Sequence, residues 1–269
     1  MRAVSWSRSL LLSLLLLGAV SVAACANIRE GGARLAADAA IPPEDEITIG
    51  KKMRVELEKE LTLHPSAEVQ SYIAALGKKL GAAAKSPVPL HFHVVKDDKQ
   101  INAFAIPGGD IYVYTGLMKA AHDEAELACV LGHEISHVSR RHVAQQLTSQ
   151  MGLSAVQGLV LGDKPGVISG LASQLAQTGV LLKFSRDHER DADEHGLPLC
   201  NGRGFDPNGL VRMFQTFKSE GEAPAMLAFL QSHPLPSERI TDAKALIKTL
   251  KPLGTNKNVD GYAVLKAKL

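Results

Sequence analysis

The sequence predicts an α+β fold that is mainly helical, with one small β-sheet over about residues 90–115. Apolar residues recur three or four positions apart through most of residues 44–250, which is typical of helices. In residues 90–115 the pattern changes to short apolar runs bounded by proline and glycine, which is typical of strands. The pentapeptide His133-Glu134-Ile135-Ser136-His137 follows in a helical segment. The expected architecture is therefore a small sheet beside a helix that carries an HExxH motif.

The helices and strands up to residue 115 are predicted from the spacing of apolar residues and from the proline and glycine residues that interrupt it. A helix is expected at 44–60, and a second at 66–84, which Pro65-Ser66 begins and the proline-rich residues 86–89 end. Strands are expected at 90–95, 101–106 and 110–115, with Pro107-Gly108-Gly109 as the turn between the last two.

The segments after the sheet are predicted to be helical. A long helix is expected from Asp123 to about Gln150, in which Gly132 costs about 1 kcal/mol against alanine. That cost predicts a close approach by another segment or by a metal site. Residues 151–183 are predicted to form two apolar helices. These helices would either pack in the core, cover the site as a lid or form a membrane-contacting patch. Further helices are expected at 185–196, stopped by Pro198, within 208–230, and at 237–250, before a tail at 251–269.

The N-terminus has the pattern of an export signal. Arg2 and Arg8 precede an apolar run that ends in Val22-Ala23-Ala24-Cys25. Small residues before a cysteine resemble the lipobox of bacterial lipoproteins, which implies removal of residues 1–24 and lipidation of Cys25. An ordinary signal peptide is the alternative. No aspartate follows Cys25, so the resemblance implies the outer membrane of a Gram-negative bacterium, facing the periplasm, with residues 25–43 as a linker.

Charge and cysteine content narrow the class of protein. The chain has 30 basic and 28 acidic residues, and loss of residues 1–24 removes two arginines and no acid. With near-neutral charge, 4% aromatic residues and no basic stripe, we expect no nucleic-acid partner. Cys129 and Cys200 of an exported chain can form a disulfide, and two buried thiols are the alternative.

The HExxH motif predicts a zinc site. Residues four apart share a helix face, so His133 and His137 can bind one Zn²⁺ ion, with Glu134 beside it as general base. Catalytic zinc needs a third protein ligand. The metzincin pattern requires glycine at 140 and histidine at 143, whereas the chain has arginine and valine there. His142 lies about 900° of helical rotation beyond His133 and is expected on the opposite side of the helix.

A later helix offers the missing ligand. Glu189 and Asp193 are four residues apart and share a face. One can coordinate zinc while the other accepts the second ring N–H of a ligand histidine. A charged, solvated helix face is the alternative interpretation.

Together these segments resemble the gluzincin metallopeptidases of the HtpX and CAAX-prenyl-protease type, especially their periplasmic members. The resemblance lies in residues 102–109, 111–113 and 116–117, in residues 131–137, in residues 185–196, and in residues 232–234 and 239–240. It implies a zincin-type domain at 44–250, with His133, His137 and Glu189 as zinc ligands, Glu134 as base and Asp193 as support. It also implies that Asn102, Ala103, Phe104 and Ala105 form an edge strand that pairs with extended substrate.

The resemblance gives the loop residue His233 two competing roles. In periplasmic members the matching histidine lies over the zinc and can take the position of the water, which keeps the enzyme latent. The other role is stabilising the oxyanion of the tetrahedral intermediate, together with Arg239. A structural zinc site would also need His233, because it is the one candidate for a fourth protein ligand.

The resemblance implies a lipid-anchored zinc endopeptidase of the bacterial envelope that cleaves unfolded or misassembled proteins. Such substrates would bind as extended strands, and the membrane would be contacted through lipid at Cys25. The alternative is a chaperone or assembly factor for outer-membrane proteins that keeps a latent metal site.

Overall fold

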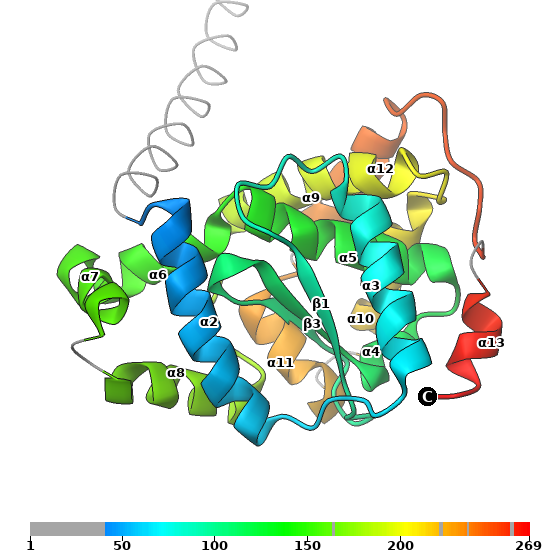
Figure 1. Ribbon diagram of the computed structural model, residues 1–269. Helices are drawn as coiled ribbons and strands as arrows, with labels where there is room; N and C mark the ends of the chain where they lie inside the picture. Colours follow the sequence, from blue (N-terminus) through cyan, green and yellow to red (C-terminus); the bar gives the residue numbers. More distant parts are fainter. Residues whose placement is uncertain (1–40, 163–164, 221–222, 236, 259–260) are drawn as a thin grey trace, which may run out of the picture.

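A computed structural model describes residues 41–162, 165–220, 223–235, 237–258 and 261–269. It confirms the predicted α+β architecture, with helices around one three-stranded sheet (Figure 1). The predicted export signal and the predicted lipidation site, Cys25, lie outside the described residues. Across the described residues, we find no helix whose length and apolar character would let it cross a bilayer.

The sheet has the strand order β1-β3-β2, so β2 lies at an edge. β1 (His91–Val95) runs parallel to β3 (Asp110–Tyr114), whereas β2 (Ala103–Ala105) runs antiparallel to it and places Phe104 opposite Tyr112. The predicted turn between β2 and β3 is a short 3₁₀ helix, η1 (Pro107–Gly109). Every residue of β3 is buried, as expected for a central strand.

Within the part of the chain that the structure describes, two helices precede the sheet, as predicted. α2 is Pro43–Glu60 and α3 is Ala67–Gly81. The Ser66 hydroxyl accepts a hydrogen bond from the Val69 N–H and caps α3. The apolar face of α3 is buried in the core through Val69, Ile73, Leu76 and Leu80. Helical spacing of apolar residues was therefore a sufficient signal for this element.

The helix predicted at 123–150 is two helices, so the continuous helix was wrong. α5 (Glu124–Ser139) ends before Arg141, whose φ of 61° is left-handed, and α6 (His142–Met151) starts after it. A left-handed non-glycine residue costs about 1–2 kcal/mol. The buried Arg141 guanidinium donates to the Glu46 carboxylate at 2.9 and 3.0 Å and to the Ile41 carbonyl. This contact with α2, about 95 residues earlier in the chain, stabilises the break.

The two helices α5 and α9 (Arg186–Asn201), which we call the ligand helices after the zinc ligands predicted on them, meet at their backbones. A Cβ atom on Gly132 would lie 2.8 Å from the Gly196 carbonyl oxygen, and one on Gly196 would lie 2.8 Å from the His133 nitrogen. The close approach predicted at Gly132 is therefore confirmed. A disulfide between Cys129 and Cys200, with Cα atoms 5.2 Å apart, joins the same two helices.

α9 continues through Pro198, so the predicted stop at that residue was wrong. An interior proline costs about 3 kcal/mol because it removes a hydrogen bond and crowds the preceding turn. Leu197, Leu199 and Cys200 are buried on this last turn, and their packing and the disulfide offset that cost.

The remaining helices complete the core. The predicted pair in 151–183 is α7 (Leu153–Leu161) and α8 (Pro165–Thr178), and α8 packs on α2 (Figure 1). Val156, Leu159 and Leu175 are buried, which supports the core interpretation of this segment, while Leu153 and Leu161 are exposed. The other helices are α4 (Thr115–Ala120), α10 (Asn208–Glu220), α11 (Pro224–Ser232), α12 (Ser237–Ile247) and α13 (Tyr262–Lys266).

Candidate active site

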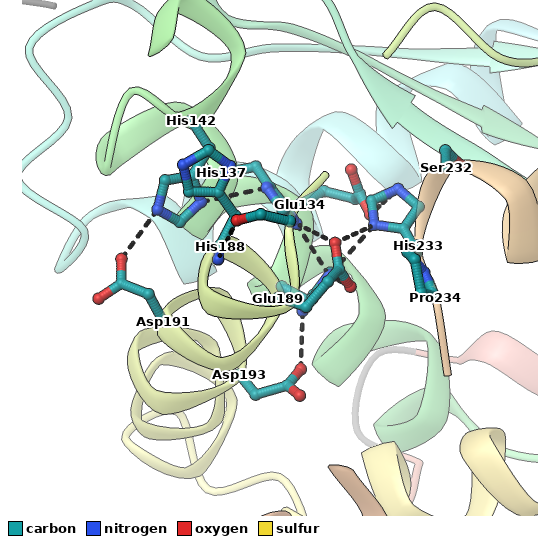
Figure 2. Close-up of polar contacts among 12 residues, drawn as sticks. Glu134, His137, His142, His188, Glu189, Asp191, Asp193, Ser232, His233 and Pro234 are labelled. Carbon is teal, nitrogen blue, oxygen red and sulfur yellow. Dashed lines mark hydrogen bonds and ion pairs between the residues drawn. The ribbon is translucent and has the colours of Figure 1, made fainter. Parts of the chain in front are cut away.

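Three segments bring the predicted site residues together. α5 carries His133, Glu134 and His137. α9 carries Glu189 and Asp193, and the residue that follows α11 is His233; Figure 2 labels these three residues with Glu134 and His137. Both ligand helices begin at capping side chains: Asp123 accepts from the Glu126 N–H, and Ser185 accepts from the His188 N–H.

Four side chains, which we call the four-residue cluster, converge on one point: His133, His137, Glu189 and His233. The Nε2 atoms of His133 and His137 are 3.0 Å apart, and each lies 3.4 Å from a Glu189 carboxylate oxygen. The His233 Nδ1 atom lies 3.0 Å from Glu189 Oε1 and 3.5 Å from His133 Nε2. A tetrahedral Zn²⁺ ion with bonds of about 2.0–2.1 Å places its ligand atoms about 3.3 Å apart. The cluster therefore fits zinc in both ligand type and spacing.

The Glu134 carboxylate lies beside this cluster without a hydrogen-bond donor. Neither of its oxygens has a hydrogen-bond partner among the described residues, and its nearest ion-pair contact is the His233 Nε2 atom, 3.7 Å from Oε1. Burial raises the pKa of this carboxyl above its ordinary value. A buried carboxylate without a partner, next to a metal-type cluster, is suited to exchange a proton with a water molecule.

His133 is held from behind by an acid and an arginine. Its Nδ1 atom lies 2.8 Å from Asp193 Oδ1, and Arg239 donates to both Asp193 oxygens at 2.8 Å and to Glu189. Burial alone would raise the pKa values of Asp193 and Glu189. Arg239 keeps the Asp193 pKa low, and His233 and Arg239 keep the Glu189 pKa low, so both carboxylates remain ionised.

His137 is held by a residue that was expected elsewhere. The break at Arg141 turns His142 toward α5, so that its Nδ1 atom lies 3.2 Å from the Nδ1 atom of His137. The expectation that His142 points to the opposite side was therefore wrong, because it assumed one continuous helix. The His142 Nε2 atom lies 2.9 Å from Asp191, a residue not considered from the sequence (Figure 2). Its only sequence signal was its place among the acids of α9.

The site is closed in this structure. The side chains of Glu134, His137 and Glu189 are 0% exposed, and those of His133 and His233 are 2% and 1% exposed. A polypeptide therefore reaches these groups only after a neighbouring segment moves.

The strand predicted to pair with substrate is also buried. Ala103, Phe104 and Ala105 form the edge strand β2, yet all three are buried. Just before β2, the Ile101 N–H donates to the Ala225 carbonyl of α11 at 2.9 Å. The Asn102 amide donates to the Gly179 carbonyl at 3.0 Å. The edge is thus present, and α11 and residue 179 lie against its start.

Comparison with known proteins agrees with this geometry. The model of peptidase family M48 matches residues 64–247. The chain is 35% identical over 204 residues to the beta-barrel assembly-enhancing protease of Yersinia pestis, which covers 70% of this chain and 41% of that protein. It is 30% identical to the metalloprotease LoiP of Escherichia coli, over 71% of this chain and 76% of LoiP.

A mitochondrial relative shares the same region. The metalloendopeptidase OMA1 of Schizosaccharomyces pombe is 32% identical over 179 residues, which covers 66% of this chain and 52% of OMA1. The chain thus spans about two fifths of the beta-barrel assembly-enhancing protease and about half of OMA1. The family resemblance inferred from the motifs is confirmed, and this chain belongs to peptidase family M48, a family of metallopeptidases.

Proposed function

We propose that the protein is a zinc-dependent endopeptidase that hydrolyses peptide bonds. The observation that carries the proposal is the four-residue cluster, whose ligand atoms lie within 4.8 Å of one another, with several pairs 3.0–3.5 Å apart, close to tetrahedral zinc spacing. Beside it lies the Glu134 carboxylate, which has no hydrogen-bond donor among the described residues. His133, His137 and Glu189 would hold the ion, with Asp193 orienting His133. Two imidazoles and one carboxylate are a ligand set known for catalytic zinc.

The proposed reaction divides between the ion and the chain. When bound, Zn²⁺ would lower the pKa of a water molecule and polarise the scissile carbonyl. Glu134 would take the proton of the attacking water and return it to the leaving amine. Burial raises its pKa, which makes the carboxylate a stronger base for the first step. Arg239 faces Glu189 and Asp193, which supports a role in orienting them over one in binding the oxyanion.

We propose that His233 acts as a latch on this site. His233 belongs to the four-residue cluster, and its Nδ1 atom lies 3.0 Å from Glu189 Oε1 and 3.5 Å from His133 Nε2, which supports a position as fourth ligand. The site is closed around it. Release of His233 would open that place to water and substrate. The segment 102–105 would then offer main-chain groups to an extended substrate strand, which gives affinity without demanding one sequence.

We propose that the enzyme acts in the envelope of a Gram-negative bacterium, on misfolded or misassembled periplasmic and outer-membrane proteins. The export signal with Cys25 supports lipid attachment on the periplasmic side of the outer membrane. Relatives named beta-barrel assembly-enhancing protease support a substrate class of that kind. A chaperone role could accompany proteolysis, and a Glu134 variant that rescues cells lacking the protein would support it.

The proposal is tested with Glu134→Gln, which keeps the size of the side chain and removes the base. We expect cleavage of an unfolded protein such as casein to fall roughly 100- to 10,000-fold, the usual range for a general base. Zinc content, measured by elemental analysis of the purified protein, should stay at one ion per chain. Cleavage at the wild-type rate by this variant would contradict the proposed mechanism.

A further inference from the structure

We infer that His142 is a positioning residue that fixes the ring of the proposed zinc ligand His137, and that Asp191 in turn fixes His142. The inference rests on the proposed zinc site and extends it. His133 is oriented directly by a carboxylate, whereas His137 meets a second imidazole. The two ligand histidines thus have separate supports.

One arrangement of protons satisfies every polar contact in this chain of groups. If the His137 Nε2 lone pair faces the ion, its proton is on Nδ1 and points at His142 Nδ1, 3.2 Å away. That atom of His142 must then be the acceptor, so the His142 proton is on Nε2. Asp191 Oδ2, 2.9 Å from Nε2, accepts it as a carboxylate. Asp191 therefore sets the tautomer of His142, and His142 sets that of His137.

His142 is held firmly enough to act as such a support. Its side chain is 4% exposed, and the His188 ring stacks on it with centroids 4.5 Å apart and planes at 18°. Asp191 is held by Arg140, which donates from Nε at 2.6 Å and from Nη2 at 2.9 Å. A two-pronged arginine contact fixes both the position and the plane of a carboxylate.

The helix break explains why this support exists. Arg141 adopts its left-handed conformation while its side chain binds Glu46, and the next residue is His142. In a continuous helix, His142 would lie on the far side from His133. The break therefore places the side chain of His142, the first residue of α6, next to the Nδ1 atom of His137 on α5.

Two substitutions of His142 separate a ligand-positioning role from a merely structural one. Asparagine places a carbonyl oxygen where Nδ1 lies, so His142→Asn keeps the acceptor for His137 and loses the bond to Asp191. Glutamine places an amide nitrogen near Nε2, so His142→Gln keeps the donor to Asp191 and loses the acceptor. His195→Ala is the matched control, because the half-exposed His195 ring also contacts Asp191, at 3.3 Å from Oδ1 and 2.8 Å from the main-chain carbonyl oxygen, and does not touch His137.

The measurement is the zinc dissociation constant of the purified full-length protein, obtained by competition with a chromophoric chelator. We expect His142→Gln and His142→Ala to weaken zinc binding about 10- to 100-fold, the usual effect of losing such a support. His142→Asn should bind closer to wild type than His142→Gln does, and His195→Ala should match wild type. The visible spectrum of the Co²⁺-substituted protein should change in the same order.

The outcomes distinguish this inference from the proposed function. Stoichiometric zinc binding by wild type with equal affinities for the Asn and Gln variants, or tighter binding by Gln, overturns the role of His142 alone. Absence of zinc binding by wild type overturns the proposed function and the inference together. If the Ala variant does not fold, the Asn and Gln variants still decide the order. Their thermal melting without metal shows whether folding is intact.

Discussion

The four-residue cluster is assembled from two regions that are held in different ways. The ligand helices α5 and α9 touch backbone to backbone at Gly132 and Gly196 and are joined by a disulfide. α11 is attached at its ends by hydrogen bonds: its Ala225 carbonyl accepts from the Ile101 N–H at 2.9 Å, and its Ser232 carbonyl accepts from the Phe184 N–H at 3.0 Å. Buried Met226 and Phe229 add apolar contact.

This difference would let the site perform two tasks that one rigid site could not combine. One is to retain a metal ion, and the other is to open for substrate. The ligand helices would bring three of the proposed zinc ligands from a covalently joined pair, which suits permanent retention of a metal ion. The proposed fourth ligand, His233, follows α11, and α11 is held by non-covalent contacts. A hydrogen bond of this kind contributes about 0.5–1.5 kcal/mol. A segment held in this way can leave while the other three ligands stay.

The largest expected effect comes from removing a ligand on the rigid side. Glu189→Gln removes a charged oxygen, and we expect zinc affinity to fall roughly 100- to 1,000-fold, because about 10–16 kcal/mol of binding free energy is shared among four ligands. Chelator competition measures the change. Asp187→Asn, an exposed acid on the first turn of the same helix, is the control and should bind zinc as wild type does. Equal affinity of the two variants would remove Glu189 from the ligand set.

A smaller effect is expected from unlinking the ligand helices. The double variant Cys129→Ser and Cys200→Ser opens a covalent loop with a sequence separation of 71 residues. We expect the free energy of unfolding to fall by about 2–4 kcal/mol, because the disulfide mainly restricts the unfolded chain. Chemical denaturation measures it. Zinc affinity of the folded variant should change little, since the Gly132–Gly196 crossing remains. An unchanged free energy of unfolding would show that the disulfide adds no stability.

The features of the molecule that could be predicted from the sequence are those set by residues close together in the chain. Local signals sufficed for the strands, for α3 with its Ser66 cap, and for the HExxH face of α5. The cost of Gly132 within a helix predicted the close approach that the Gly196 crossing provides. These features depend on residues within one or two turns of each other, or on one residue that is otherwise unfavourable.

The features that escaped prediction depend on distant partners. The break at Arg141 needs Glu46 on α2, and α9 passes through Pro198 because its last turn is buried and linked to Cys129. No periodicity within 123–150 reveals either contact. The support of His137 by His142 follows from that break, so it was missed for the same reason.

The proposed latch role of His233 is tested by removing its side chain. If the open state is about 1–10% populated, His233→Ala should raise kcat/KM for an unfolded protein about 10- to 100-fold, because the closed state loses its ligand. His91→Ala, an exposed histidine on β1, is the control. If His233 instead stabilises the oxyanion, the same variant should lose about 100- to 1,000-fold in kcat. The direction of the change therefore decides between the two roles.

The smallest expected effect comes from loosening α11 without touching the cluster. Ile101→Pro removes the N–H that donates to the Ala225 carbonyl, at a position just before an edge strand where proline is tolerated. Loss of one hydrogen bond of about 0.5–1.5 kcal/mol should raise the open population, and with it kcat/KM, about 2- to 10-fold. Ile101→Ala keeps the N–H and should show less activation. If α11 does not have to move for substrate to enter, the proline variant will be no more active than the alanine variant, and only His233 will separate the closed site from the open one.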